Sequence, residues 1–153
     1  MKKPIDIQLT KEGLENFEKE QQVLIDKRPY VLARLVAARE QGDLSENAGY
    51  HAAKDELAYI DHRIRELKLL LRFADVTETN QTEVVAFGSV VTISDGQRNM
   101  VYTIVGQLEA NPVKGKLSDV SPIGKMLIGK KVGESVKVDI PNGNITYKVI
   151  SIS

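Results

Sequence analysis

The sequence predicts an α+β protein in two parts, an antiparallel two-helix coiled coil followed by a small antiparallel sheet with one helix. In the first half, apolar residues recur at alternating spacings of three and four. The second half consists of short alternating segments bounded by glycine, proline and asparagine. A polar stretch, TETNQTE, separates the halves. We therefore expect a coiled-coil hairpin at residues 1–76, a linker at 77–83 and a second domain at 84–153.

Two apolar stripes define the expected helices. Six of the eight positions in the first stripe are apolar: Leu14, Phe17, Gln21, Leu24, Arg28, Val31, Leu35 and Ala38. The second stripe is apolar throughout: Tyr50, Ala53, Leu57, Ile60, Ile64, Leu67, Leu71 and Ala74. Such spacing is typical of helices that pack along a common seam. With about 30 residues per helix, the hairpin should be roughly 45 Å long and should protrude.

Pro29 lies inside the first predicted helix. A proline there removes one backbone hydrogen bond and costs about 3 kcal/mol. We therefore expect a kink or a break near residues 25–29. Packing should also be looser there, because the seam positions Gln21 and Arg28 are polar.

The turn between the two helices has the sequence QGDLSEN. Gly42 is suited to the left-handed conformation that ends a helix. Asp43 is a suitable cap for the next helix, with Glu46 at the capping-box position three residues later. Spacing alone leaves two interpretations open for this acidic pair: a structural cap, or an exposed functional site.

The second half predicts two hairpins and a short helix. Residues 84–94 and 99–105 flank Asp95-Gly96, which is a strong hairpin signal. Residues 136–140 and 145–152 flank a second turn, PNGN. Between these hairpins, Ser121 is a suitable cap with Pro122 at the first helical position, and Gly129 would end that helix.

Composition excludes several classes of function. The formal net charge is +0, which argues against free-standing DNA binding, because such binding needs a strong basic field. The absence of cysteine excludes disulfides, thiolate catalysis and cysteine-type zinc sites. No apolar run approaches the ~20 residues that span a bilayer, and the first residues do not form a secretory signal. We therefore expect a cytoplasmic protein that does not bind membranes.

Three motifs carry a resemblance to a known family. The segment REQGDLSENAGYHAA at residues 39–53 resembles the tip signature of bacterial Gre transcript-cleavage factors of the GreA type. Arg28-Pro29 and the segment SPIGKMLIGKKVG at residues 121–133 also resemble this family. The likeness covers essentially the whole chain.

The resemblance implies a specific fold and function. It implies an N-terminal coiled coil, a C-terminal domain of FKBP-like fold, and docking of that domain on RNA polymerase. The hairpin tip would enter the secondary channel and stimulate hydrolytic cleavage of backtracked nascent RNA by the polymerase, so the chain itself is not expected to be an enzyme. The expected partners are RNA polymerase and, within the complex, the backtracked RNA. A monomer is expected.

Asp43 and Glu46 match the two acidic tip residues of the family. The resemblance implies that they act in trans in the polymerase active site. They would help to hold a Mg²⁺ ion shared with the polymerase, and no cofactor of the chain's own is expected. Arg39, Asn47 and Tyr50 are candidate tip contacts. The plain alternatives are a solvated helix charge for Arg39 and seam packing for Tyr50.

Two glycines depart from the family pattern. Gly49 stands where a charged or larger residue is usual, and Gly124 stands where alanine is commoner. A glycine costs about 1 kcal/mol relative to alanine within a helix. Gly49 therefore makes the geometry of the tip an open question.

Three alternative functions are weighed against transcript cleavage. One is a Gre-like factor that occupies the channel and modulates or inhibits the polymerase without stimulating cleavage; the acidic pair favours stimulation. A second is a prolyl isomerase, for which the second half offers only Phe87, Tyr102 and Tyr147 as pocket aromatics. A third is a plain coiled-coil adaptor, which gives no reason for an acidic tip.

Overall fold

The computed structural model describes residues 7–43, 46–77 and 83–153. Most of the predicted linker, residues 78–82, lies outside the described residues. Two compact units are present. Residues 14–74 form a helical unit, and residues 7–13 group with residues 75–153 in a second unit. None of the described helices is long and apolar enough to span a membrane.

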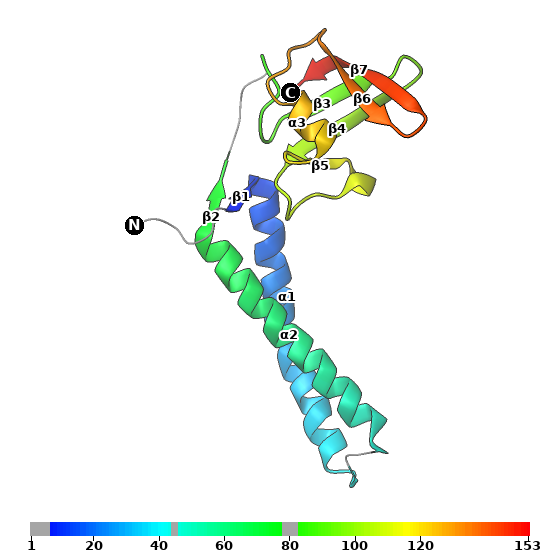
Figure 1. The fold of residues 1–153 in the computed structure, drawn as a ribbon. Helices are drawn as coiled ribbons and strands as arrows, with labels where there is room; N and C mark the ends of the chain where they lie inside the picture. The colour runs from blue at the N-terminus through cyan, green and yellow to red at the C-terminus, as the bar shows by residue number, and fades with distance from the viewer. Residues whose placement is uncertain (1–6, 44–45, 78–82) are drawn as a thin grey trace. The chain divides into compact units, whose positions relative to one another are not determined.

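The helical unit is a hairpin of two long helices (Figure 1), α1 at Lys11–Arg39 and α2 at Ala48–Phe73. Every residue of the two predicted stripes is buried or half-buried. The most deeply buried seam residues are Val31, Ile60 and Leu67. Both stripes therefore face each other across one seam, and the predicted fold of this half is confirmed.

Pro29 does not break the first helix. The helix is continuous from Lys11 to Arg39, so the expected break is wrong. The polar seam position Arg28 instead finds a partner on the opposite helix. Its Nε lies 2.6 Å from Asp61 Oδ1, and a second nitrogen lies 3.3 Å from Asp61 Oδ2. This hydrogen-bonded guanidinium lowers the pKa of the Asp61 carboxyl. A forked ion pair of this kind satisfies a cation beside an otherwise apolar seam.

Ion pairs join the helices along one edge of the seam. Arg63 Nε lies 2.7 Å from Glu20 Oε1, and Lys27 Nζ lies 3.0 Å from Glu56 Oε1. Arg34 also pairs with Glu56. The three α1 residues are seven positions apart, as are the two α2 residues, so each set shares one helix face. Charged side chains therefore close this edge of the hairpin.

The second unit contains a five-stranded sheet and one short α-helix. Its strands are β3 (Val90–Ser94), β4 (Asn99–Val105), β5 (Lys116–Ser118), β6 (Ser135–Ile140) and β7 (Gly143–Ile152). Their order is β5-β4-β3-β7-β6. All neighbours are antiparallel except β4 and β5, which are parallel. The predicted small sheet with one helix is confirmed, but β5 and its parallel pairing were not predicted.

Smaller elements complete the fold. They are a two-stranded sheet of β1 (Ile7–Leu9) and β2 (Ala74–Val76), a 3₁₀ turn η2 (Pro112–Lys114), and α3 (Pro122–Leu127). Ser121 caps α3 as predicted, because its hydroxyl accepts a hydrogen bond from the Gly124 N–H at 3.1 Å.

The first strand of the large sheet is shorter than predicted. It begins at Val90 rather than Val84. Before it, Gly88 has a φ of 88°, and the Ser89 hydroxyl accepts a hydrogen bond from the Ala86 N–H at 3.0 Å. The regular strand therefore starts after this turn, although the Gly88 N–H and the Ser89 carbonyl still hydrogen-bond to Ile104 of β4. The Asp95-Gly96 turn is confirmed: Gly96 has a φ of 96° and the strands on either side pair.

The core of the second unit lies between the sheet and α3. Its buried residues are Val85, Val91, Ile93, Ile104, Leu127, Val136, Val149 and Ile152. Tyr102 and Tyr147 pack against this cluster. Two of the three aromatics available to a prolyl isomerase pocket therefore serve the core.

Two residues cap the start of α1: Thr10, which directly precedes the helix, and Glu109, which lies far along the chain. The Thr10 hydroxyl accepts a hydrogen bond from the Gly13 N–H at 3.0 Å, as an N-cap does. Glu109 accepts two further hydrogen bonds, one from the Thr10 hydroxyl and one from the Thr10 N–H at 2.9 Å. A side chain at Gly13 would collide with this carboxylate. Glu109 thus occupies the space that a glutamate at position 13 would fill in an ordinary capping box.

Candidate functional site

The tip of the hairpin is the turn between α1 and α2. The first helix ends at Arg39, and its last turn closes through a hydrogen bond from the Gln41 N–H to the Ala38 carbonyl at 3.2 Å. Gly42 follows with a φ of 109°, in the region that favours glycine, as the sequence predicts. Leu44 and Ser45 lie outside the described residues.

Asn47 caps the second helix. Its side-chain oxygen accepts a hydrogen bond from the Tyr50 N–H at 2.9 Å, and its side-chain amide donates to the Ala38 carbonyl at 2.7 Å. The predicted cap at Asp43 is therefore wrong, because the helix begins at Ala48. A signal was present, since asparagine is a preferred cap and Asn47 lies three residues before the first seam position. Asn47 is also half-buried rather than an exposed neighbour of the tip.

Asp43 and Glu46 both have exposed side chains on this turn. With Asn47 as the cap, the structural interpretation of the acidic pair loses its main support. Carboxylate oxygens are the hard ligands that Mg²⁺ prefers, and this ion is usually held by one or two carboxylates together with substrate phosphates. Among residues 7–43, 46–77 and 83–153, no three histidine, aspartate or glutamate side chains cluster to hold a metal.

The other predicted tip residues lie in different environments. Arg39 is exposed at the last position of α1. Tyr50 is half-buried at the third position of α2, as seam packing requires. Its ring meets the His51 ring edge-on at 5.4 Å. Of the three candidate tip contacts, Arg39 is the one with an exposed side chain. Contact with a partner stays a prediction for Arg39, Asn47 and Tyr50.

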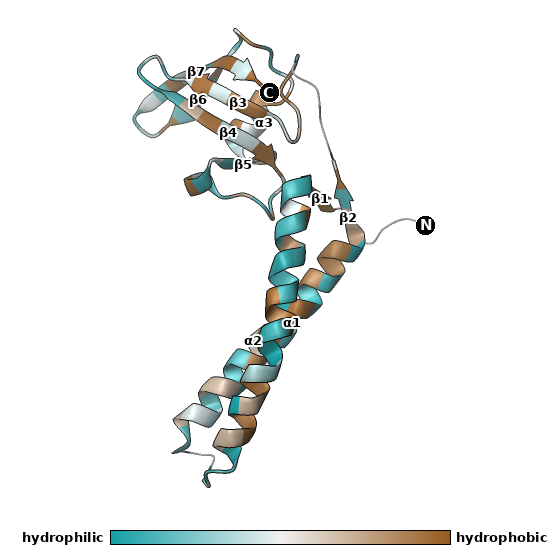
Figure 2. Ribbon diagram, turned by 180° about the vertical axis from the view of Figure 1, so that it is seen from behind, coloured by the Kyte–Doolittle hydropathy of each residue, from teal (hydrophilic) through white to brown (hydrophobic). Residues whose placement is uncertain are grey.

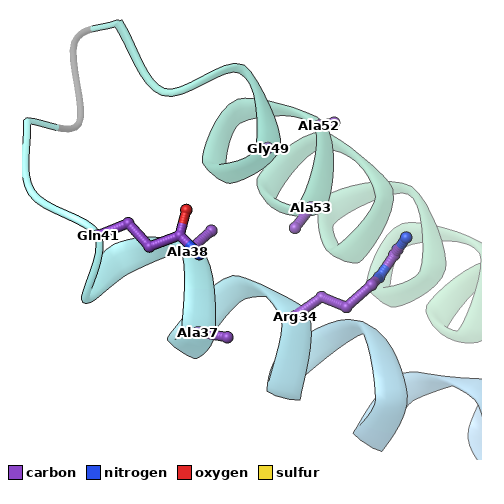
Figure 3. Close-up of a pocket in the computed structure, with 7 residues that line it drawn as sticks. All are labelled: Arg34, Ala37, Ala38, Gln41, Gly49, Ala52 and Ala53. Carbon is purple, nitrogen blue, oxygen red and sulfur yellow. The ribbon is translucent and has the colours of Figure 1, made fainter.

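Behind the turn, a hollow of about 340 Å³ opens between the two helices. Figure 3 shows its lining, which comes from both helices: Arg34, Ala37, Ala38, Gln41, Gly49, Ala52 and Ala53. Most of these side chains are small, so the helices leave space at this end of the seam. A Cβ at Gly49 would meet only Asn47 Oδ1 at 3.4 Å, which is an ordinary contact. The open question about Gly49 therefore concerns the filling of this hollow rather than backbone strain.

Family comparisons cover both halves of the chain. Residues 7–76 match the family described as transcription elongation factor, N-terminal. Residues 80–153 match the family described as transcription elongation factor, GreA/GreB, C-terminal.

Individual relatives match over nearly their whole length. A transcription elongation factor GreA from Caldanaerobacter subterraneus is 43% identical over 157 residues, covering 99% of both chains. Another from Neorickettsia sennetsu is 42% identical over 149 residues, covering 94% of both.

Solved structures are also similar. GreA factor homolog 1 (Gfh1) of Thermus thermophilus has 31% identity and a TM-score of 0.46, covering 97% of this chain and 99% of its own. A GreA/GreB factor from Nitrosomonas europaea has 18% identity and a TM-score of 0.44, covering 96% and 98%.

Proposed function

This chain belongs to the GreA/GreB family of transcription elongation factors, which stimulate transcript cleavage by RNA polymerase, and we propose that its Asp43 and Glu46 carry that activity. In this proposal the hairpin tip enters the secondary channel of the polymerase and the acidic pair reaches the active centre. Cleavage of backtracked nascent RNA then rescues arrested complexes. The observation that supports this most is the exposure of both carboxylates on the turn at the end of a long hairpin.

The two carboxylates have a limited chemical task. Their oxygens suit a Mg²⁺ ion that the polymerase and an RNA phosphate also hold. Bound there beside a metal that the polymerase already holds, the ion would complete a two-metal site, in which one metal activates a water and the other stabilises the leaving oxygen. Asp43 and Glu46 contribute negative charge and oxygen ligands, and the Asn47 cap fixes the start of α2 two residues after Glu46.

The chain is proposed to act in trans and to have no nuclease activity of its own. Two carboxylates on an exposed turn neither exclude water nor complete a metal's ligand set. The proposal also places the free chain as a monomer in the cytoplasm, where bacterial transcription takes place. Contact with nascent RNA is proposed only within the elongation complex.

Cleavage assays on backtracked complexes test this function. Asp43→Asn and Glu46→Gln remove charge while keeping side-chain shape, and each should reduce stimulated cleavage by at least about 100-fold. Binding to polymerase should persist. Asp55→Asn, which removes an exposed carboxylate from α2, is the matched control and should support normal cleavage.

Two results would contradict the proposal. One is unchanged cleavage in both tip variants. The other is binding of the unmodified protein without any stimulation, which would assign it to the channel-occupying alternative.

A further inference from the structure

Residues 29–38, a stretch near the distal end of α1, are apolar on nearly every side. Residues 29–38 read PYVLARLVAA, in which Arg34 is the one charged residue. A helix that is apolar all round is normally covered all round. In this hairpin α2 covers only the seam side of α1, so the remaining sides face solvent.

The uncovered residues form a defined surface, here named the distal apolar face. It comprises Pro29, Tyr30, Leu32, Ala33 and Val36, all exposed. The exposed fraction is 76% for Tyr30, 39% for Leu32 and 46% for Val36. Arg34 reaches across to Glu56, so its charge is engaged with α2. In Figure 2 the distal part of α1 is coloured mostly brown and pale.

The exposed face of α2 has a different character. Because Arg28 pairs with Asp61 and Asn47 bonds to Ala38, residues 48–60 of α2 lie opposite residues 29–38. The exposed residues of that stretch are Ala48, Gly49, His51, Ala52, Lys54, Asp55, Ala58 and Tyr59. Charged side chains suit water or a polar surface. This stretch of α2 therefore mixes Lys54 and Asp55 with small residues and Tyr59, whereas the distal apolar face carries no charged residue. The uncharged face is the one that suits an apolar partner.

Size argues against a second copy of this chain as that partner. Tyr30, which is 76% exposed, alone presents on the order of 150 Å² of accessible surface, and the whole face presents a few hundred Å². A stable complex buries about 800 Å² per partner. The face is thus too small for a dimer by itself, but it fits as one part of a larger interface.

Its place in the chain identifies that interface. Val36 lies three residues before the end of α1 and seven before Asp43. A protein that encloses the tip must also enclose this stretch of helix. We propose that the distal apolar face packs against an apolar, charge-poor wall of the RNA polymerase channel and so sets which side of the hairpin faces that wall. This inference rests on the proposed function, since it takes RNA polymerase as the molecule that receives the tip.

A pair of matched charge insertions tests the inference. Ala33→Glu puts a carboxylate on the distal apolar face, and Ala58→Glu puts the same group on the exposed face of α2. A charge against an apolar wall is strongly unfavourable. Binding of full-length fluorescent protein to core polymerase should weaken at least about tenfold for Ala33→Glu and less than twofold for Ala58→Glu. Equal affinities would overturn the inference.

A second pair removes apolar surface instead of adding charge. The Leu32→Gln/Val36→Gln protein should bind core polymerase about tenfold more weakly than the unmodified protein. The control protein, Val23→Gln/Leu69→Gln, alters exposed apolar residues elsewhere on the hairpin and should bind core polymerase normally. Glutamine favours helix at least as well as valine, so the hairpin is retained, as circular dichroism would verify.

The readouts separate this inference from the proposed function. Weak binding by the face variants with intact binding by the Asp43 variant supports the inference, whether or not the unmodified protein stimulates cleavage. Concentration-dependent dimers that disappear in Ala33→Glu would instead assign the face to self-association and overturn it. Failure of the unmodified protein to bind polymerase would overturn both.

Discussion

Asn47 joins the two helices at the tip, donating to the Ala38 carbonyl at 2.7 Å while accepting from the Tyr50 N–H at 2.9 Å. One side chain thus satisfies a carbonyl near the end of α1 and an N–H at the start of α2. Both groups belong to helix termini. The Ala38 carbonyl also accepts from the Gln41 N–H at 3.2 Å, so Asn47 adds a second bond to it. The position of the acidic pair between these termini therefore depends on Asn47.

Replacement of Asn47 by alanine should destabilise the hairpin by about 1–2 kcal/mol, because it removes both the cap and the link to Ala38. Urea denaturation followed by circular dichroism measures the change. Asn47→Asp keeps an oxygen that accepts from Tyr50 but loses the donor to Ala38, so its loss should be intermediate. Equal stability of the alanine variant and the unmodified protein would refute the capping role.

Replacement of Gly49 by alanine should stabilise the protein by up to about 1 kcal/mol, since Gly49 lies within the first turn of α2 and its Cβ would make only an ordinary contact. The opposite sign is expected for Gly42→Ala, because Gly42 has a φ of 109°. Thermal melting of both variants checks the pair. A lower melting temperature for Gly49→Ala would mean that the tip needs the freedom of glycine.

Acid should weaken the hairpin. The guanidinium of Arg28 lowers the pKa of Asp61, and Lys27 followed by Arg34 lowers the pKa of Glu56. Because both folded pKa values lie below the ordinary values of 3.8 and 4.5, the stabilisation is complete above about pH 4.5 and is lost as the pH falls through the folded values.

Melting temperatures measured by helical circular dichroism between pH 7 and pH 2.5 check this expectation. The melting temperature should change little down to pH 5 and then fall, with a shallower fall for Asp61→Asn. The difference should shrink in 1 M salt, because exposed ion pairs are screened. An identical acid profile for Asp61→Asn and for the control Asp55→Asn would contradict a role for the Arg28 pair.

Replacement of Gly124 by alanine should destabilise the second unit by about 1–3 kcal/mol. A Cβ at this buried position would collide with the Ser118 carbonyl and approach Ser121 Oγ to 2.8 Å. Native-state hydrogen exchange of backbone amides in the second unit measures the loss. A neutral result would show that residues 118–121 shift without cost.

The seam was predictable because it depends on a periodic pattern. Each stripe residue needed only a spacing rule, and none is fully exposed. The strand from Asn99 to Val105 was predicted to the residue for a similar reason, since β-branched residues fill it and a strong turn precedes it. Patterns of this kind sum many weak preferences, so one unfavourable residue such as Pro29 does not reverse them.

The cap of α2 was not predictable with the same security. Asp43, Ser45 and Asn47 are all good caps, and the choice depends on which one also reaches the Ala38 carbonyl across the turn. The Arg28–Asp61 pair is likewise a contact between separate helices that no local rule reports. The short strand β5 has three residues and pairs in parallel with β4, so its sequence carries almost no signal.

The hydrogen bonds from Thr10 to Glu109 join residues that are 99 positions apart. Because the chain is synthesised from its N-terminus, the beginning of α1 leaves the ribosome long before this glutamate exists. The rest of the helix and its seam partners are all present once residue 74 has been added. The hairpin can therefore assemble first, while its opening turn acquires a complete cap only after the C-terminal unit has been made.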